Sequence, residues 1–175
     1  LRFTEAGGAG APNKFAGSVG LDAFHPLAPR MRALGLHAEM WIPCERFAAD
    51  ARALLAHGVP IVLDHMGRLD VSRGVDDPSF RTMLAAVREG TAWVKLCPAR
   101  ASKQFPDYAD VRPFHDALVD ANPDRVIWGT DRPYLRMGDK TPDPAKLLAI
   151  LAEWLGSDDL LCRVLADNPA RLYGF

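Results

Sequence analysis

Short apolar runs alternate along this chain with amphipathic stretches, and the runs are followed by polar turns that contain proline or glycine. The runs are apolar on both faces, which is typical of strands in a parallel sheet that is covered on both sides. Strand and helix alternate with short connections, as in right-handed βαβ units. The pattern predicts an α/β fold with strands at residues 37–42, 59–64, 92–96 and 126–129, and a shorter strand at 1–3.

Helix start and stop signals mark the stretches between these runs. Asp77-Pro78 joins a capping carboxylate to a proline in the first turn, and Gly90 ends the same helix. Pro113 can stand only near the start of its helix, because an interior proline removes a hydrogen bond. Residues 4–20 are rich in glycine, and we expect a flexible loop there. The spacing predicts helices at residues 26–34, 45–57, 77–89, 144–155 and 157–166, and one that begins near Pro113.

Reactive side chains stand where several of these strands end. A parallel barrel presents its catalytic groups at the C-terminal ends of its strands, so these positions are the first candidates for chemistry. Arg2, inside the first short strand, and Arg100, just beyond the strand at 92–96, could each bind an anion or lie at the surface. The side chains at the ends of the other two strands are His65, after residues 59–64, and Asp131, after residues 126–129.

Each strand-end residue has a functional and a structural interpretation. His65 can serve as a hydrogen-bond donor, a proton shuttle or a metal ligand, and the guanidinium of Arg68 matches a carboxylate. Asp131 ends an apolar strand, where an unpaired carboxylate is costly to bury, so we expect a general base or a metal ligand. The structural alternatives are a buried histidine, a surface arginine, and a turn aspartate paired with Arg132. Cys97 is interpreted as a small core residue, because no positioned base is evident.

Composition narrows the class of protein. The chain has 175 residues, 49% of them hydrophobic, and a formal net charge of -1. That charge gives no attraction to nucleic acid, and the apolar runs are too short to cross a membrane. The three cysteines are widely spaced and odd in number, which favours a reducing compartment, and we predict a cytoplasmic location.

Four motifs, in this order along the chain, resemble those of the amidohydrolase-related family, and within it the 2-pyrone-4,6-dicarboxylate lactonase group. The resemblance extends over nearly the whole chain, and we treat residues 1–175 as one amidohydrolase-related domain. The motifs are Val62-Leu63-Asp64-His65-Met66-Gly67-Arg68, Val94-Lys95-Leu96-Cys97-Pro98-Ala99-Arg100, Val126-Ile127-Trp128-Gly129-Thr130-Asp131-Arg132-Pro133 and Asp167-Asn168-Pro169-Ala170-Arg171-Leu172-Tyr173-Gly174.

The resemblance implies a (β/α)8 barrel that hydrolyses a lactone ring without a metal ion or other cofactor. Asp131 then corresponds to the aspartate that activates water, and His65 to a histidine that polarises the scissile carbonyl. Arg68, Arg100 and Arg2 correspond to arginines that hold the carboxylates of a small anionic lactone. The chemistry is consistent, since such a substrate needs guanidinium groups, an activated water and donors for the developing oxyanion.

The chain departs from the family in its first residues. It lacks the His-x-His pair of the family's first strand, and a complete barrel typically needs ~250 residues. We therefore expect the C-terminal part of a barrel, with about five strands and an incomplete N-terminal side. As an isolated chain it is expected to be inactive and to aggregate, because an open barrel leaves two strand edges unpaired.

Two other hypotheses remain open. In the first, the protein is a metal-dependent decarboxylase or amidohydrolase of the same superfamily, and His65 or Asp131 binds one divalent metal such as zinc. In the second, the chain is a non-catalytic α/β module with a binding role. The sequence does not fix the oligomeric state or the exact substrate.

Overall fold

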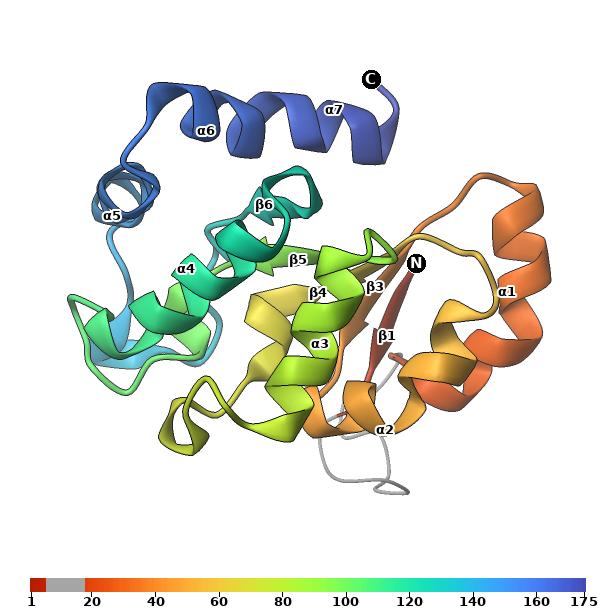
Figure 1. Ribbon diagram of the computed structural model, residues 1–175. Helices are drawn as coiled ribbons and strands as arrows, with labels where there is room; N and C mark the ends of the chain where they lie inside the picture. Colours follow the sequence, from red (N-terminus) through yellow and green to blue (C-terminus); the bar gives the residue numbers. More distant parts are fainter. Residues whose placement is uncertain (6–17) are drawn as a thin grey trace.

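The computed structural model describes residues 1–5 and 18–175, which form one parallel sheet with helices packed against it (Figure 1). The strands lie in the order β2-β1-β3-β4-β5-β6. The short β2 lies at the edge beside β1, and the other five strands follow one another in chain order. This is the arrangement of successive units in part of a (β/α)8 barrel. The strands are β1 (Arg2–Thr4), β2 (Val19–Gly20), β3 (Ala38–Trp41), β4 (Ile61–Leu63), β5 (Ala92–Leu96) and β6 (Val126–Trp128).

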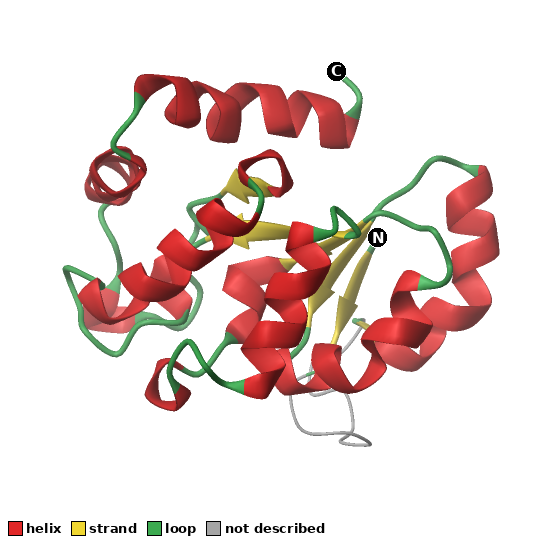
Figure 2. Cartoon of the chain, viewed as in Figure 1, coloured by secondary structure: helices red, strands yellow, loops and turns green. Residues whose placement is uncertain are grey.

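Helices occupy nearly all the stretches that the spacing predicts, and Figure 2 shows how they surround the strands. Asp77 caps its helix by accepting from the backbone N–H groups of Ser79 and Phe80, and Pro113 lies in the first turn of its helix. The α/β fold predicted from the sequence is thus confirmed. The helices are α1 (Phe24–Ala33), α2 (Cys44–Leu55), α3 (Pro78–Arg88), α4 (Arg112–Ala121), α5 (Pro144–Leu155), α6 (Asp158–Cys162) and α7 (Asn168–Tyr173).

Three predicted boundaries need correction. The loop predicted at residues 4–20 is shorter at both ends, because Thr4 belongs to β1 and Val19–Gly20 form β2 beside it. That prediction for residues 6–17 lies outside the described residues. The helix predicted at residues 157–166 ends at Cys162, and a π-helical turn over Arg163–Asp167 connects it to α7.

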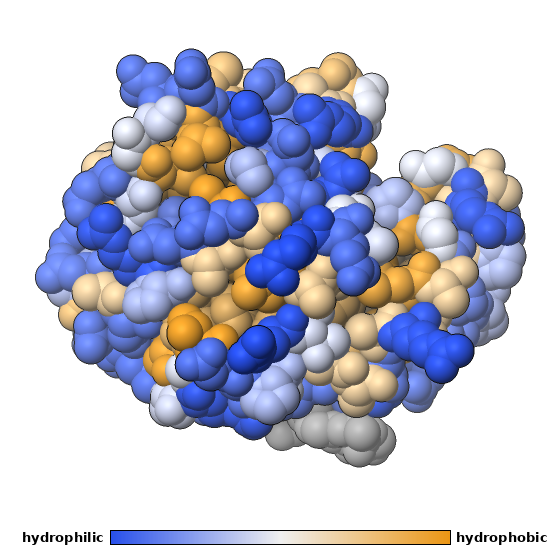
Figure 3. All heavy atoms as spheres, viewed as in Figure 1, coloured by the Kyte–Doolittle hydropathy of each residue, from blue (hydrophilic) through white to orange (hydrophobic). Residues whose placement is uncertain are grey.

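The two faces of the sheet have different partners, because successive side chains of a strand point to opposite faces. In β5, Val94 and Leu96 belong to the main apolar core, whereas Trp93 and Lys95 face the other way. Helices α1 to α4 cover the first face, which we call the outer face. Seen from that side, charged and polar side chains cover most of the helices, with apolar patches between them (Figure 3).

The opposite, inner face changes character along the strands. Towards the strand starts, Val62, Trp93 and Ile127 form a small apolar cluster against Leu172 of α7. Asn168, fully buried at the start of α7, donates to the backbone carbonyls of Pro123 and Val126 and so ties this helix to β6. Towards the strand ends the inner face becomes charged, and this charged end is where the candidate site lies. Within the described ranges no helix is long and apolar enough to cross a membrane.

Candidate functional site

The chain turns sharply where β4 ends, and this turn places His65. His65, Met66, Gly67 and Arg68 all have positive φ angles, between 47° and 66°. A left-handed residue other than glycine costs roughly 1–2 kcal/mol, so such a run is kept only when the surroundings enforce it. The turn packs closely against α3: at Gly67 an added Cβ would collide with Sδ of the buried Met83.

A second turn follows β6 and places Asp131. Asp131 has a φ of 66°, and Tyr134 and Arg136 in the same loop are also left-handed. The buried Tyr134 packs among side chains of α5 and neighbouring loops, and its N–H donates to the carbonyl of Asp131 at 3.0 Å. Gly129 just before the loop allows the aliphatic part of Lys95 to pass, since a Cβ there would lie 3.0 Å from Cδ of that lysine.

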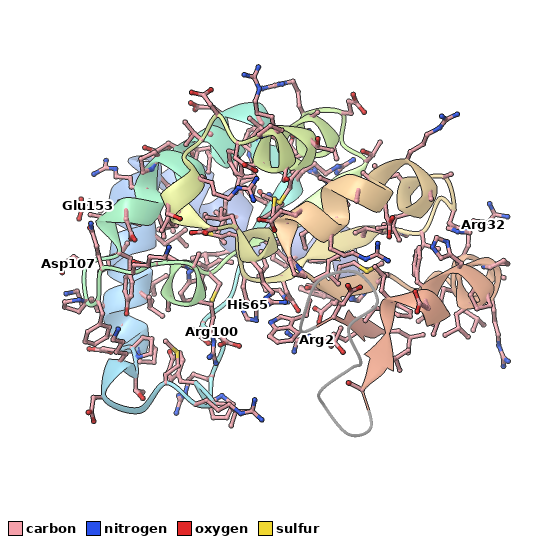
Figure 4. All side chains as sticks on the ribbon, turned by 90° about the horizontal axis from the view of Figure 1, so that it is seen from below. Arg2, Arg32, His65, Arg100, Asp107 and Glu153 are labelled. Atoms are coloured by element: carbon pink, nitrogen blue, oxygen red, sulfur yellow. The ribbon has the colours of Figure 1, made fainter. Side chains whose placement is uncertain are left out.

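These turns bring four of the predicted residues together (Figure 4). Arg2 Nη2 lies 3.4 Å from Nε2 of His65, which in turn lies 3.7 Å from Oδ1 of Asp131. Oδ2 of the same aspartate accepts from Nε of Arg100 at 2.5 Å. Figure 4 looks at the strand ends and shows Arg2, His65 and Arg100 grouped there, whereas Arg32 and Glu153 lie at the periphery. Carboxylate, imidazole and guanidinium groups are therefore in direct reach of one another.

A network of ion pairs on the inner face of the sheet adjoins this group and holds Arg2 in place. Asp64 is almost fully buried and binds Nη2 of Arg2 at 2.7 Å and Nζ of Lys95 at 2.8 Å. Lys95 also donates to Glu39 at 2.9 Å. Burial alone would lower the pKa of Lys95, but the attraction of Asp64 and Glu39 outweighs it and raises that pKa. Lys95 therefore stays charged and holds the carboxylate of Asp64, which in turn binds Arg2.

Burial favours the neutral form of His65. Burial lowers the pKa of this imidazole below its usual value of 6.5, although Asp64 and Asp131 act in the opposite direction. Its Nδ1 is buried and has no hydrogen-bond partner among the described residues. Burial raises the pKa of the neighbouring Cys97 thiol to about 12, so that side chain stays a protonated core residue, as the sequence predicts.

Two cavities meet at Arg2, His65 and Asp131. The first, which we call the outer cavity, has a volume of about 450 Å³ and is also lined by Trp41, Arg100 and Arg136, among others. The second, the inner cavity, has a volume of about 310 Å³ and extends along the inner face to Glu39, Asp64 and Lys95. His65 and Asp131 thus stand beside a cavity large enough for a ring, and a few polar groups at such a cavity are common in small-molecule sites.

Arg68 has other partners than the sequence suggests. Its guanidinium lies 4.2 Å from the ring centroid of Trp41, and it donates to the backbone carbonyl of Glu5 at 2.8 Å. Arg68 is not among the residues that line either cavity, so a direct contact with substrate stays a prediction. What the structure shows is a cation stacked on the indole that forms one wall of the outer cavity.

Sequence reasoning missed several residues of this site. Asp64 and Lys95 lie inside the quoted motifs, but the sequence pattern did not indicate a function for them. Arg136 lies in an exposed loop that has no recognisable sequence motif. A charge within an apolar strand is a usable signal for Lys95 and Glu39, because only a partner or a cavity makes such a residue tolerable on an inner face.

A divalent metal ion does not fit the described residues. In residues 1–5 and 18–175 no three His, Cys, Asp or Glu side chains come together as a ligand set. The two carboxylates nearest His65 are already paired with guanidinium groups, Asp64 with Arg2 and Asp131 with Arg100. Cationic side chains thus lie where a metal ion needs anionic ligands.

The chain is similar in sequence to several known proteins. The sequence profile of the amidohydrolase family, Amidohydro_2, matches residues 6–175. The chain is 39% identical over 142 residues to a 4-sulfomuconolactone hydrolase of Hydrogenophaga intermedia, covering 77% of this chain and 47% of that protein. It is 35% identical over 162 residues to a 2-pyrone-4,6-dicarboxylate hydrolase of Comamonas testosteroni, covering 87% of this chain and 53% of that protein.

A solved structure supports the fold alone. An apo crystal structure of an Agrobacterium tumefaciens protein superposes with a TM-score of 0.80 at 24% identity, covering 91% of this chain and 58% of that one. The chain spans about half the length of the curated relatives it matches.

Proposed function

The chain belongs to the amidohydrolase family, and from this membership we propose that the protein hydrolyses the ring ester of an anionic lactone with water activated by Asp131. One observation carries the proposal: the carboxylate of Asp131 and the imidazole of His65 lie 3.7 Å apart at a cavity that three arginines line. The names of the two relatives describe hydrolases that act on lactones with a sulfonate or carboxylate group, which supports the same class.

The proposed reaction begins with water between Asp131 and the ester carbonyl. Asp131 takes a proton from the water as the new C–O bond forms, and the carbonyl oxygen becomes an oxyanion. Arg2 is placed to donate to that oxyanion, and His65 donates to it in the tautomer that carries the proton on Nε2, the ring nitrogen that lies between Arg2 and Asp131. The ring C–O bond then breaks, and the leaving oxygen recovers the proton from Asp131, which gives a hydroxyl group and a carboxylic acid that releases its proton to solvent to become a carboxylate.

Arg100 has a double role in this proposal. Its Nε donates to Oδ2 of Asp131 and so directs Oδ1 towards His65 and the water. Arg100 also lines the outer cavity, where its guanidinium can bind an anionic group of the substrate. Trp41, stacked on Arg68, supplies an apolar wall against which a ring can pack.

The reaction is proposed to proceed without a metal ion, and the pairing of the described carboxylates near His65 with arginines supports this. The cytoplasmic location remains a prediction, and the three unpaired cysteines are consistent with it.

The test compares an anionic lactone with the same lactone carrying a methyl ester in place of the anionic group. Removing one charge-assisted contact to an arginine costs about 1.5–3 kcal/mol, so we expect kcat/KM to fall about 10- to 100-fold. Ring opening is followed by the absorbance of the lactone, in the whole protein that carries this chain and with a chelator present. Equal rates for both lactones would contradict the anion-binding proposal, and loss of CO2 in place of ring opening would favour a decarboxylase.

A further inference from the structure

A series of ion pairs with alternating charge crosses the inner face of the sheet. Arg2 of β1 binds Asp64, the first residue after β4, at 2.7 Å. Asp64 in turn binds Lys95 of β5 at 2.8 Å, and Lys95 binds Glu39 of β3 at 2.9 Å. The series contains two cations and two carboxylates, so its charges balance. One end of it reaches the reacting groups, because Nη2 of Arg2 lies 3.4 Å from Nε2 of His65 (Figure 4).

Lys95 is the residue on which this balance depends. Its ammonium contacts two carboxylates from different strands, Glu39 and Asp64, which both lie on the inner face. A carboxylate that is partly or fully buried is costly unless a cation compensates it. The packing leaves room for the lysine, since a Cβ at Gly129 would lie only 3.0 Å from Cδ of Lys95.

Arg2 is the least constrained member of the series. Its side chain is 47% exposed, against 25% or less for the other three members. It lines both cavities, so its guanidinium can lie towards either one. Without Lys95, Asp64 and Glu39 would have Arg2 as the nearest cation of the series. Their attraction would then draw the guanidinium into the inner cavity, away from His65.

From this arrangement we propose that Lys95 is a positioning residue for the reaction: it neutralises Asp64 and Glu39 and so keeps Arg2 beside His65, where it faces the ester. Lys95 acts through Arg2 and does not bind the substrate, since its ammonium is held by the two carboxylates. This inference rests on the proposed lactone hydrolysis, to which it adds a residue outside the reacting groups.

The experiment replaces Lys95 with methionine, which has a side chain of similar length and no charge. Displacement of Arg2 removes one donor to the oxyanion, so kcat is expected to fall about 100-fold while KM changes by about threefold or less. Lys103→Met is the matched control. Lys103 also binds a carboxylate at 2.8 Å, that of Asp70, but lines neither cavity, and its replacement should leave kcat unchanged.

A double variant separates the charge of Lys95 from its other properties. Lys95→Met combined with Glu39→Gln removes one cation and one carboxylate, so that Arg2 and Asp64 remain as a balanced pair. This variant should recover at least about tenfold of the lost kcat, because the two substitutions compensate one another. A double variant no faster than the single one would overturn the proposal, since Lys95 would then act on the substrate itself. A kcat for Lys95→Met within about threefold of wild type would also overturn it.

Thermal unfolding shows which variants are folded. If Lys95→Met does not fold, the charge-balanced double variant decides alone. A kcat for the double variant within about tenfold of wild type then supports the proposal, and a larger fall overturns it.

Crystal structures of the whole protein and of its folded variants test the placement of Arg2 without any turnover. In Lys95→Met the guanidinium is expected to move from His65 towards Asp64 and Glu39, and in the double variant it should keep its wild-type position. An Arg2 that stays beside His65 in Lys95→Met, or that leaves it in the double variant, would overturn the role of Lys95. Placement as expected in a set of proteins that all fail to open a lactone, wild type included, would refute only the proposed function.

Discussion

Replacing Asp131 with asparagine is expected to lower kcat for lactone hydrolysis by about 10³-fold, within the 10²- to 10⁴-fold range of general acid–base catalysis. Asparagine cannot take a proton from water, but its amide oxygen can still accept from Arg100. Asparagine also tolerates the left-handed backbone of this position, where φ is 66°. The change thus removes the proton acceptor and little else.

Asp139→Asn is the control for this substitution. Asp139 is exposed a few residues further along, outside the residues that line either cavity. Rates are measured with the preferred anionic lactone, and thermal unfolding reports whether both variants keep the fold. A kcat for Asp131→Asn within about threefold of wild type would show that another group activates the water.

Replacing Gly67 with alanine is expected to reduce the free energy of unfolding by about 3 kcal/mol and to displace His65. About 1 kcal/mol comes from forcing alanine into a left-handed conformation, with φ at 66°. The remainder comes from overpacking, because the new Cβ would collide with Sδ of Met83, which is fully buried. Chemical denaturation measures the stability, and kcat of the folded variant measures the effect on His65.

Gly156→Ala separates the two contributions. Gly156 ends α5 with φ 63° and ψ 11°, close to the 66° and 20° of Gly67, and its Cβ would meet only the carbonyl oxygen of Glu153 at 4.0 Å, an ordinary contact. Alanine there should cost only the backbone contribution, about 1 kcal/mol. In a Met83→Ala background the further cost of Gly67→Ala should likewise fall to about 1 kcal/mol. Equal costs for Gly67→Ala and Gly156→Ala would refute the collision with Met83.

Much of the fold can be predicted from the sequence because its signals are local. The helix at Pro144–Leu155 has the predicted bounds, since Asp143 caps its start and Gly156 ends it. The strand at Ala92–Leu96 also agrees with the prediction. By contrast, β2 has only two residues and no apolar run, and only the neighbouring β1 defines it as a strand.

In the site, too, some residues can be predicted from local sequence signals and others depend on tertiary structure. His65 and Asp131 could be found because catalytic groups in parallel α/β folds stand at strand ends. Lys95 and Glu39 are visible in the sequence as charges within strands, but their partners are not, because only parallel pairing brings Lys95 to both Glu39 and Asp64. The partners of Arg68 also depend on tertiary structure, since Trp41 comes from another strand. Spacing along the chain cannot show which side chain a guanidinium meets across a sheet.

The most direct test of the central claim is a single turnover in ¹⁸O-labelled water with the protein in excess over an anionic lactone. If Asp131 activates water, the carboxylate of the opened product carries one ¹⁸O atom after the first turnover, and the protein carries none. An unlabelled product carboxylate together with ¹⁸O in Asp131 would contradict the account, because the aspartate would then have attacked the ester itself.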